Sequence, residues 1–209
     1  MNAHSVHAKR FQAGSLQSPP SGPNGHPIET PQLDAKHHFM PMSQFILGGA
    51  RSGKSQRALE LAEGTGDRRT FIATAEAWDE EMAERIARHK TERGAGWSTI
   101  EAPHDLVSAI HVAAEQADVC LVDCLTLWLS NLMHQDQDIA LETEQLCDAI
   151  AQMPIPIILV SNEVGLGLVP ETPLGRTFRD AQGRLNQAVA RVCERVEFVA
   201  AGLPLTLKS

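Results

Sequence analysis

The sequence predicts an α/β domain in which helices flank a mainly parallel sheet and a β-hairpin ends the chain. After Met42, short apolar runs of strand length alternate with longer amphipathic stretches of helix length, as in proteins built from βαβ units. A glycine-rich segment joins the first of these strands to the first helix. Near the C-terminus, Gly202 separates two apolar runs closely enough to predict a hairpin.

Hydrophobic periodicity sets the expected elements. Apolar runs bounded by turn residues predict strands at residues 44–47, 70–73, 98–101, 119–123, 155–161, 196–200 and 203–208. Apolar side chains spaced three and four residues apart predict helices at residues 54–63, 79–93, 104–116, 126–133, 140–152 and 174–194. Since no internal repeat and no long linker follows Met42, residues 43–209 are expected to form one domain.

Residues 1–42 differ in composition from the rest of the chain. They hold five of the nine histidines and six of the twelve prolines, with few apolar residues at helix or strand spacing. Such a segment cannot bury enough surface to offset its chain entropy, so we expect a disordered tail. A metal-binding histidine tract is an alternative, but the spacing lacks the regularity of a ligand set. A start codon placed too far upstream is another, because Met40 and Met42 precede the first strand.

Composition argues against several classes of protein. The net charge of −8 gives no basic surface for wrapping DNA or RNA, so no nucleic-acid partner is expected. No run approaches the roughly 18 to 20 apolar residues of a spanning helix, and the N-terminus lacks the apolar segment of a secretory signal. We therefore expect a cytoplasmic protein without a membrane span. The four cysteines form no CxxC pair and are expected to be reduced and buried.

The glycine-rich segment has the sequence of a phosphate-binding loop. It reads Gly48-Gly49-Ala50-Arg51-Ser52-Gly53-Lys54-Ser55, which matches GxxxxGK[ST] with a strand before it and a helix after it. Glycines at both ends let the loop curl until its backbone N–H groups point at a β-phosphate. Lys54 is expected to reach the β- and γ-phosphate oxygens as a catalytic cation, and Ser55 to bind Mg²⁺. The pattern predicts a P-loop NTPase-like fold, and the alternative of a merely flexible turn leaves Lys54 unexplained.

Asp123 is expected to complete the magnesium site. It ends the apolar run at residues 119–123. A phosphate loop needs a carboxylate on a neighbouring strand to complete the coordination shell of the magnesium ion. Asp123 is therefore the expected partner of Ser55, although an aspartate also ends many ordinary strands.

Further motifs follow the phosphate loop in a fixed order. They are Ile72-Ala73-Thr74-Ala75, Asp79-Glu80-Glu81-Met82 leading through Arg85-Ile86 to His89-Lys90, Trp97 with Glu101, NEVGLGLVP at 162–170, and RTFRDAQGRLNQ at 176–187. In order and spacing, these motifs strongly resemble the bifunctional adenosylcobinamide kinase and adenosylcobinamide-phosphate guanylyltransferase family of cobalamin synthesis. The resemblance runs from Gly48 to Lys208, and the first 42 residues fall outside it.

The resemblance implies two reactions in one fold. A nucleoside triphosphate, ATP or GTP, phosphorylates the terminal hydroxyl of adenosylcobinamide, and GMP from GTP is then transferred onto that phosphate with release of pyrophosphate. In similar proteins a histidine carries the GMP covalently, and His89 stands at the matching position. The family often has a second histidine just before it, where this chain has Arg88. Similar proteins also suggest a homo-oligomer, specifically a trimer.

The residues around His89 agree with a nucleophilic role. The neighbouring cations Arg85, Arg88, Lys90 and Arg93 disfavour the imidazolium form, so a neutral ring nitrogen would be available while the same cations neutralise a triphosphate. A solvated histidine on a basic helix face is the alternative.

The resemblance also assigns contacts to the guanine nucleotide. Glu101 matches the residue that accepts hydrogen bonds from the base, which suits the adjacent N–H donors of guanine; a surface acid at a strand end is the alternative. Two segments are expected to line the guanylyl group: Ala73, Thr74 and Ala75 after one strand, and Lys90, Thr91, Glu92 and Arg93 after His89.

The segment 162–170 is expected to lie near the corrinoid. It follows a strand of the parallel sheet, where loops at the carboxyl ends bind substrates. Arg176 or Arg179 would then hold the cobinamide phosphate. A structural ion pair between Glu163 and Arg179 that fixes the loop is the alternative.

Two other functions are compatible with parts of the pattern. A P-loop kinase that only phosphorylates a small hydroxylated substrate would leave His89 inert. A non-catalytic nucleotide switch would use the phosphate loop alone and ignore a corrinoid.

Overall fold

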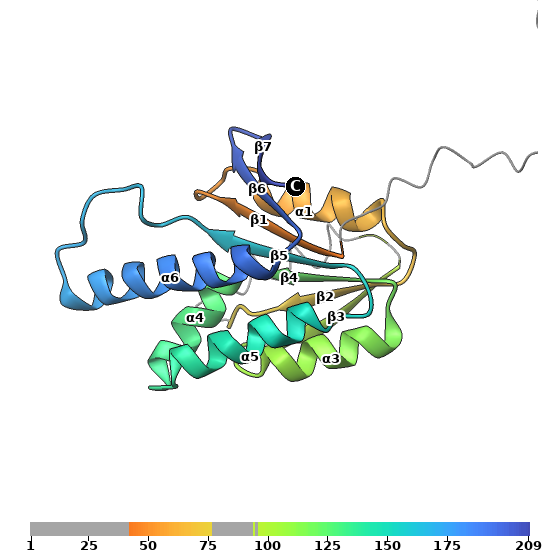
Figure 1. Ribbon diagram of the computed structural model, residues 1–209, viewed down its shortest axis with the longest axis horizontal. Helices are drawn as coiled ribbons and strands as arrows, with labels where there is room; N and C mark the ends of the chain where they lie inside the picture. The colour runs from red at the N-terminus through yellow and green to blue at the C-terminus, as the bar shows by residue number, and fades with distance from the viewer. Residues whose placement is uncertain (1–41, 77–93, 95) are drawn as a thin grey trace, which may run out of the picture. The chain divides into compact units, whose positions relative to one another are not determined.

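The computed structural model describes residues 42–76, 94 and 96–209. Within these residues, seven strands form one sheet in the order β3-β2-β4-β5-β1-β6-β7 (Figure 1). The pairs among β1 to β6 are parallel, whereas β7 pairs antiparallel with β6. The predicted α/β class and the C-terminal hairpin are therefore confirmed.

The elements lie close to the positions that periodicity predicts. The strands are β1 (Ser43–Gly48), β2 (Arg69–Ala73), β3 (Trp97–Glu101), β4 (Val119–Asp123), β5 (Ile157–Asn162), β6 (Arg195–Ala200) and β7 (Leu203–Lys208). The helices are α1 (Lys54–Glu63), α3 (Leu106–Gln116), α4 (Leu125–His134), α5 (Ile139–Ala151) and α6 (Pro173–Val192). The helix predicted at 79–93 and the tail predicted at 1–42, apart from Met42, lie outside the described residues.

Capping residues explain why two helices start one or two residues away from their predicted first residues. α3 begins after Asp105, whose carboxylate accepts a hydrogen bond from Ser108 N. α6 begins after Thr172, whose hydroxyl accepts one from Gly175 N. Both side chains satisfy an N–H group that the first turn leaves without a helical partner.

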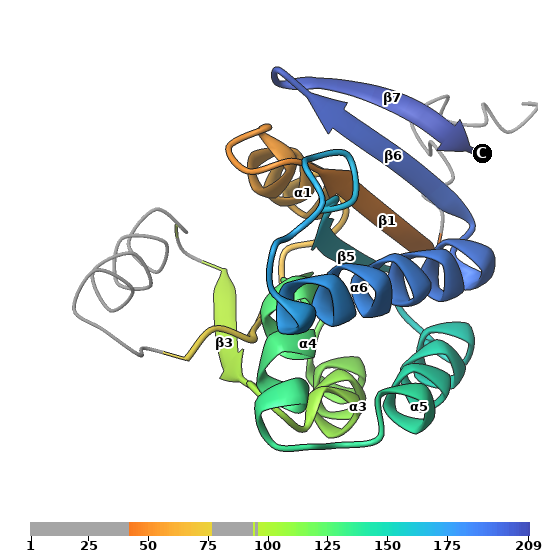
Figure 2. The same ribbon diagram turned by 90° about the vertical axis from the view of Figure 1, so that its left-hand side faces the viewer.

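The sheet lies between two layers of helices, with α1 on one face and α3 to α6 on the other (Figure 2). Alternate residues of β1 face opposite sides, so Phe45 belongs to the core shared with α3 to α6 and Ile46 to the core shared with α1. Helix α1 covers its face with the buried Ala58 and Ala62. No helix in the part of the chain described here is long and apolar enough to cross a membrane.

The parallel strands bring their carboxyl ends to one edge of the sheet. In the strand register, Gly48 of β1 lies opposite Asn162 of β5, and Ala73 of β2 lies opposite both Asp123 of β4 and Glu101 of β3. The segments that follow these five strands therefore start side by side, which is where open α/β sheets bind ligands.

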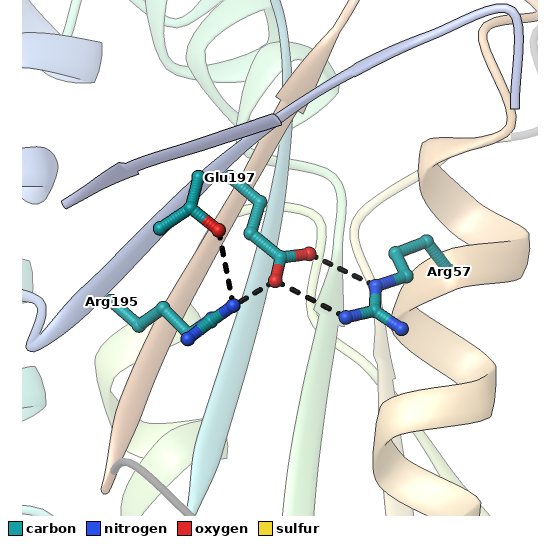
Figure 3. Close-up of polar contacts among 4 residues, drawn as sticks. Arg57, Arg195 and Glu197 are labelled. Atoms are coloured by element: carbon teal, nitrogen blue, oxygen red, sulfur yellow. Dashed lines mark hydrogen bonds and ion pairs between the residues drawn. The ribbon is translucent and has the colours of Figure 1, made fainter. Parts of the chain in front are cut away.

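A buried carboxylate ties the C-terminal hairpin to α1 (Figure 3). The side chain of Glu197 in β6 is 1% exposed and accepts hydrogen bonds from Arg57 of α1 at 2.9 and 3.1 Å and from Arg195 at 2.9 Å. Arg195 also donates to Thr206 Oγ1 of β7. Burial by itself raises the pKa of Glu197, but the hydrogen bonds and charges of the two arginines outweigh it and hold that pKa below the ordinary value.

Glu197→Gln is expected to lower the free energy of unfolding by about 1–3 kcal/mol at pH 7, because it removes the negative charge between two arginines. Since the folded-state pKa is lower than the ordinary 4.5, this contribution is complete above pH 4.5 and is lost as the pH falls through the folded-state pKa. Urea unfolding at pH 7 and below pH 4 measures both effects. Glu144→Gln, on the exposed side of α5, is the matched control, and a difference between the two variants that stays constant with pH would contradict the assignment.

Candidate active site

The phosphate loop joins β1 to α1 with a backbone conformation that suits its glycines. Gly53, immediately before α1, has φ 97°, and Arg51 has φ 55°. Both residues are thus in the left-handed region, where glycine is least strained. Lys54 Nζ donates a hydrogen bond to Gly49 O at 3.2 Å. The ammonium group therefore folds back onto the first half of the loop.

Gly48 has no room for a side chain. A Cβ atom here would lie 2.5 Å from Ser52 Oγ and 2.6 Å from the carbonyl oxygen of Val199 in β6. Since Val199 O belongs to the backbone of a paired strand, no side-chain rotation could relieve that contact. Glycine at position 48 is therefore required by packing as well as by the curl of the loop.

Asp123 lies at the same edge of the sheet as Lys54. Burial is the main reason that the pKa of the neighbouring Cys124 thiol rises to about 12; the charge of Asp123 also raises it, and the charge of Lys54 lowers it. Both charges thus act on one buried thiol. The structure brings the predicted lysine and carboxylate to a common region.

Ser55 and Asp123 offer oxygen donors of the kind that Mg²⁺ prefers. Ser55 lies in the first turn of α1, and Asp123 ends β4. Among the described residues, no group of three or more His, Cys, Asp or Glu side chains could hold a metal ion. This donor set fits Mg²⁺, which is commonly bound by one or two protein groups together with nucleotide phosphates and water.

Thr74 fixes the turn after β2 from inside the protein. Its hydroxyl donates to Cys124 O at 2.7 Å and accepts from Cys124 N at 2.8 Å. Asn131 of α4 donates to Thr74 O at 2.9 Å and to Pro103 O at 3.0 Å. Three of the segments at the carboxyl edge are thereby tied together by two buried side chains.

Glu101 borders a surface pocket. It is exposed at the end of β3, the edge strand, and Ala102 N donates to Ala73 O at 2.8 Å. The pocket has a volume of about 420 Å³ and lies between the end of β3 and the first turns of α3, with Pro103, Ser108 and Val112 among its lining residues. The predicted base-binding acid therefore stands beside a hollow on the same edge as the phosphate loop.

His104 lines this pocket and was not singled out by sequence reasoning. Its Nε2 lies 3.0 Å from Glu76 Oε1 and 3.0 Å from Gln135 Nε2, and its carbonyl accepts from Trp128 Nε1. The residues sit 28, 31 and 24 positions from His104 in the sequence, so no local pattern could have linked them.

Comparison with known proteins identifies the family. A family model described as "Cobinamide kinase / cobinamide phosphate guanyltransferase" matches residues 44–207, the span that holds all of these groups. The chain belongs to this family. The bifunctional adenosylcobalamin biosynthesis protein CobP of Pseudomonas aeruginosa is 50% identical over 169 residues, which cover 80% of this chain and 98% of that protein. CobU of Escherichia coli is 36% identical over 182 residues, covering 80% of this chain and all of that protein.

Membership of the cobinamide kinase and guanylyltransferase family makes the protein an enzyme of adenosylcobalamin biosynthesis. A solved ATPase of a bacterial type III secretion system shares its fold, with a TM-score of 0.51 at 10% identity over 79% of this chain and 56% of that chain. At such low identity the likeness concerns the fold alone, and it confirms the predicted P-loop NTPase-like architecture.

The family motif at 162–170 begins in a network of buried polar side chains. Ser161 Oγ donates to Asn186 Oδ1, Gln182 donates to both, and Asn186 Nδ2 donates to the carbonyl of Asn162. Asn162 N donates to Thr126 Oγ1 at 2.8 Å. The backbone of Asn162 is thus held on both sides, next to Gly48, while the following loop exposes Leu166 and Leu168.

The two arginines expected to bind the cobinamide phosphate make local contacts. Arg176 donates to the carbonyls of Pro170 and Glu171, so it holds the end of the loop. Arg179 pairs with Asp180, and Glu163 accepts from Gly165 N at 2.5 Å. The alternative of a Glu163–Arg179 ion pair is replaced by these two contacts.

The expected nucleophile of the family lies in a part of the chain that the structure does not describe. This holds for His89 and for Lys90, Thr91, Glu92 and Arg93. Their roles remain predictions, as do the contacts of Ala73 and Ala75 with the guanylyl group.

Thr74→Val is expected to lower the free energy of unfolding by about 1–3 kcal/mol, since it keeps the shape of the side chain but leaves the N–H and C=O of buried Cys124 unpaired. Thr74→Ser keeps the hydroxyl and should retain most of the stability. Denaturant unfolding of both variants measures the difference. A loss in Thr74→Ser as large as that in Thr74→Val would mean that the methyl group contributes as much as the hydroxyl, and would contradict the assignment.

Proposed function

We propose that this enzyme phosphorylates the terminal hydroxyl of adenosylcobinamide and then transfers GMP from GTP onto the new phosphate, giving adenosylcobinamide-GDP and pyrophosphate. One observation carries the proposal: a single phosphate loop, a single carboxylate at the end of β4 and a pocket with an acid at its rim share one edge of the sheet, in a chain of this family. One triphosphate site would then serve both reactions in turn.

In the kinase step the substrate hydroxyl oxygen attacks the γ-phosphorus of ATP or GTP, the bond from that phosphorus to the β-phosphate oxygen breaks, ADP or GDP leaves, and the hydroxyl proton is released to water. The N–H groups of the phosphate loop and the ammonium of Lys54 neutralise charge on the β- and γ-phosphates. Ser55 and Asp123 would hold Mg²⁺, which supplies positive charge to the phosphate oxygens. The ammonium of Lys54 has three N–H donors, of which one bonds Gly49 O, so two remain for phosphate oxygens.

In the guanylyl step a ring nitrogen of His89 forms a bond to the α-phosphorus of GTP, and pyrophosphate leaves. An oxygen of adenosylcobinamide phosphate then attacks the same phosphorus, the P–N bond breaks, and the histidine is restored. Splitting the transfer lets one site exchange a triphosphate for a corrinoid phosphate between two easier steps. Glu101 would accept hydrogen bonds from N1–H and the amino group of guanine, donors that adenine does not present together.

We further propose that the protein acts in the cytoplasm as a homo-oligomer, specifically a trimer. Leu203, Leu205 and Leu207 alternate along β7 and are all more than half exposed, which supports a contact between copies.

His89→Ala is expected to abolish guanylyl transfer and spare much of the kinase reaction. Lys54→Ala should abolish both reactions, because the same phosphate loop binds the triphosphate in each of them. Incubation with α-labelled GTP should label the parent protein with a bond that is stable to base and labile to acid, and γ-labelled GTP should leave no label. His111→Ala, on the exposed face of α3, is the matched control.

Three results would overturn this assignment. The first is guanylyl transfer at the parent rate by the His89→Ala variant, and the second is a label that maps to Lys90. The third is full guanylyl transfer by Lys54→Ala, which would separate the two triphosphate sites. If the parent protein shows kinase activity but forms no labelled protein, it is the P-loop kinase without guanylyl transfer, the alternative that the sequence leaves open.

Glu101→Gln is expected to reduce kcat/KM for GTP in guanylyl transfer by roughly ten- to a hundredfold, since a charged acceptor of two hydrogen bonds is lost. The kinase reaction with ATP should change little, as adenine offers the acid no matching donors. Steady-state kinetics with each nucleotide give the comparison, and Glu115→Gln on the exposed side of α3 is the control. A loss of the same size with both nucleotides would make Glu101 a structural residue.

A further inference from the structure

The turn between β6 and β7 touches the phosphate loop. Gly202 N donates a hydrogen bond to the carbonyl oxygen of Ser52 at 2.8 Å, although the two residues are far apart in the sequence. Ala201 and Gly202 have φ values of 50° and 78°, as in the tight two-residue turns that suit twisted hairpins. The last strand pair therefore presents a backbone donor to the loop.

The hairpin backbone also packs against both glycines of the loop pattern. A Cβ atom on Gly53 would lie 3.1 Å from Gly202 Cα, and one on Gly48 would lie 2.6 Å from Val199 O. These distances are too short for ordinary side chains. The loop and the hairpin are thus in close contact at the start and at the end of the pattern.

Because the peptide bond between Ser52 and Gly53 is planar, the hydrogen bond from Gly202 N to Ser52 O also determines the direction of the Gly53 N–H. In a trans peptide the C=O of one residue and the N–H of the next point in opposite directions. Gly202 N–H fixes the direction of Ser52 C=O toward the hairpin. The N–H of Gly53 must then point away from the hairpin, into the curl of the loop where backbone N–H groups hold phosphate.

We propose that the backbone N–H of Gly202 is a positioning group for the phosphate site: it orients the Gly53 amide toward the β-phosphate of the bound nucleotide. The proposal rests on the proposed function, in that the loop must bind a triphosphate. It adds a residue from the C-terminal hairpin, outside the phosphate-binding pattern, to the groups that determine nucleotide affinity.

A second contact keeps the turn in register with the loop. Glu197, in the strand that leads to the turn, binds Arg57, and Arg57 N donates to Gly53 O at 2.9 Å as α1 begins. The strand before Gly202 and the helix after Gly53 are therefore joined by a side-chain pair (Figure 3). This partly buried contact holds β6 against α1, next to the turn and the loop.

The test replaces one backbone N–H by an ester oxygen and leaves every side chain unchanged. Residues 1–192 are produced as a thioester and ligated to a synthetic peptide of residues 193–209, which begins with the native Cys193. Three full-length proteins are compared: the all-amide chain, a chain with the ester at Gly202, and a matched control with the ester at Leu205 within β7. Calorimetry measures the affinity of each for inorganic tripolyphosphate, and thermal unfolding measures stability.

The Gly202 ester is expected to bind tripolyphosphate roughly three- to tenfold more weakly than the all-amide chain, the effect of one hydrogen bond, and the Leu205 ester to bind it as the all-amide chain does. Equal affinity in all three proteins, or an equal loss in both esters, would overturn the proposal. So would a Gly202 ester that does not fold, because the bond would then be structural.

Tripolyphosphate keeps this test separate from the reaction assignment. It needs neither a corrinoid nor His89, so failure of kinase or guanylyl activity leaves the comparison intact. Only an all-amide chain that binds no tripolyphosphate would refute the phosphate loop and the positioning group together.

Discussion

The placement of β1 between β5 and β6 is the constraint on which the site depends. All six residues of β1 are buried, and both neighbours run parallel to it, so Gly48 ends beside Asn162 on one side and Val199 on the other. A shift of one residue would turn Phe45 and Ile46 to the wrong faces of the sheet. Hydrophobic burial within one short strand therefore sets where the loop at residues 48–55 lies.

Around this fixed point, neutral polar side chains shape the backbone at the edge of the sheet. Thr74 and Asn131 join the ends of β2 and β4 to the segment after β3, and Asn186 holds the end of β5. Each is buried, so its hydrogen bonds are worth more than they would be in water, and an unpaired group would be costly. Buried amides and hydroxyls therefore position the backbone at this edge of the sheet.

Local patterns in the sequence predict most of the fold and part of the site. The phosphate loop and Asp123 could be predicted because each is marked by its own strand and its own residue types. The apolar run at 155–161 predicts β5 two residues too early, since Pro156 has no N–H to donate to a neighbouring strand. Contacts such as Asn131 with Thr74 join residues 57 positions apart and leave no periodic trace. The same is true of Gly202 and Ser52, whose pairing exists only once the sheet has formed.

The long separation between β1 and β6 has a consequence for synthesis of the protein. Residues 43–55 emerge from the ribosome well before residues 195–202, which flank β1 and reach the loop. Until then β1 has a partner on one side at most. Contacts between distant parts of a chain form late and slowly. In a nascent chain the loop at residues 48–55 therefore becomes fixed only after residues 195–202 have been synthesised, and a product truncated before residue 195 retains the loop sequence without the strand that holds it.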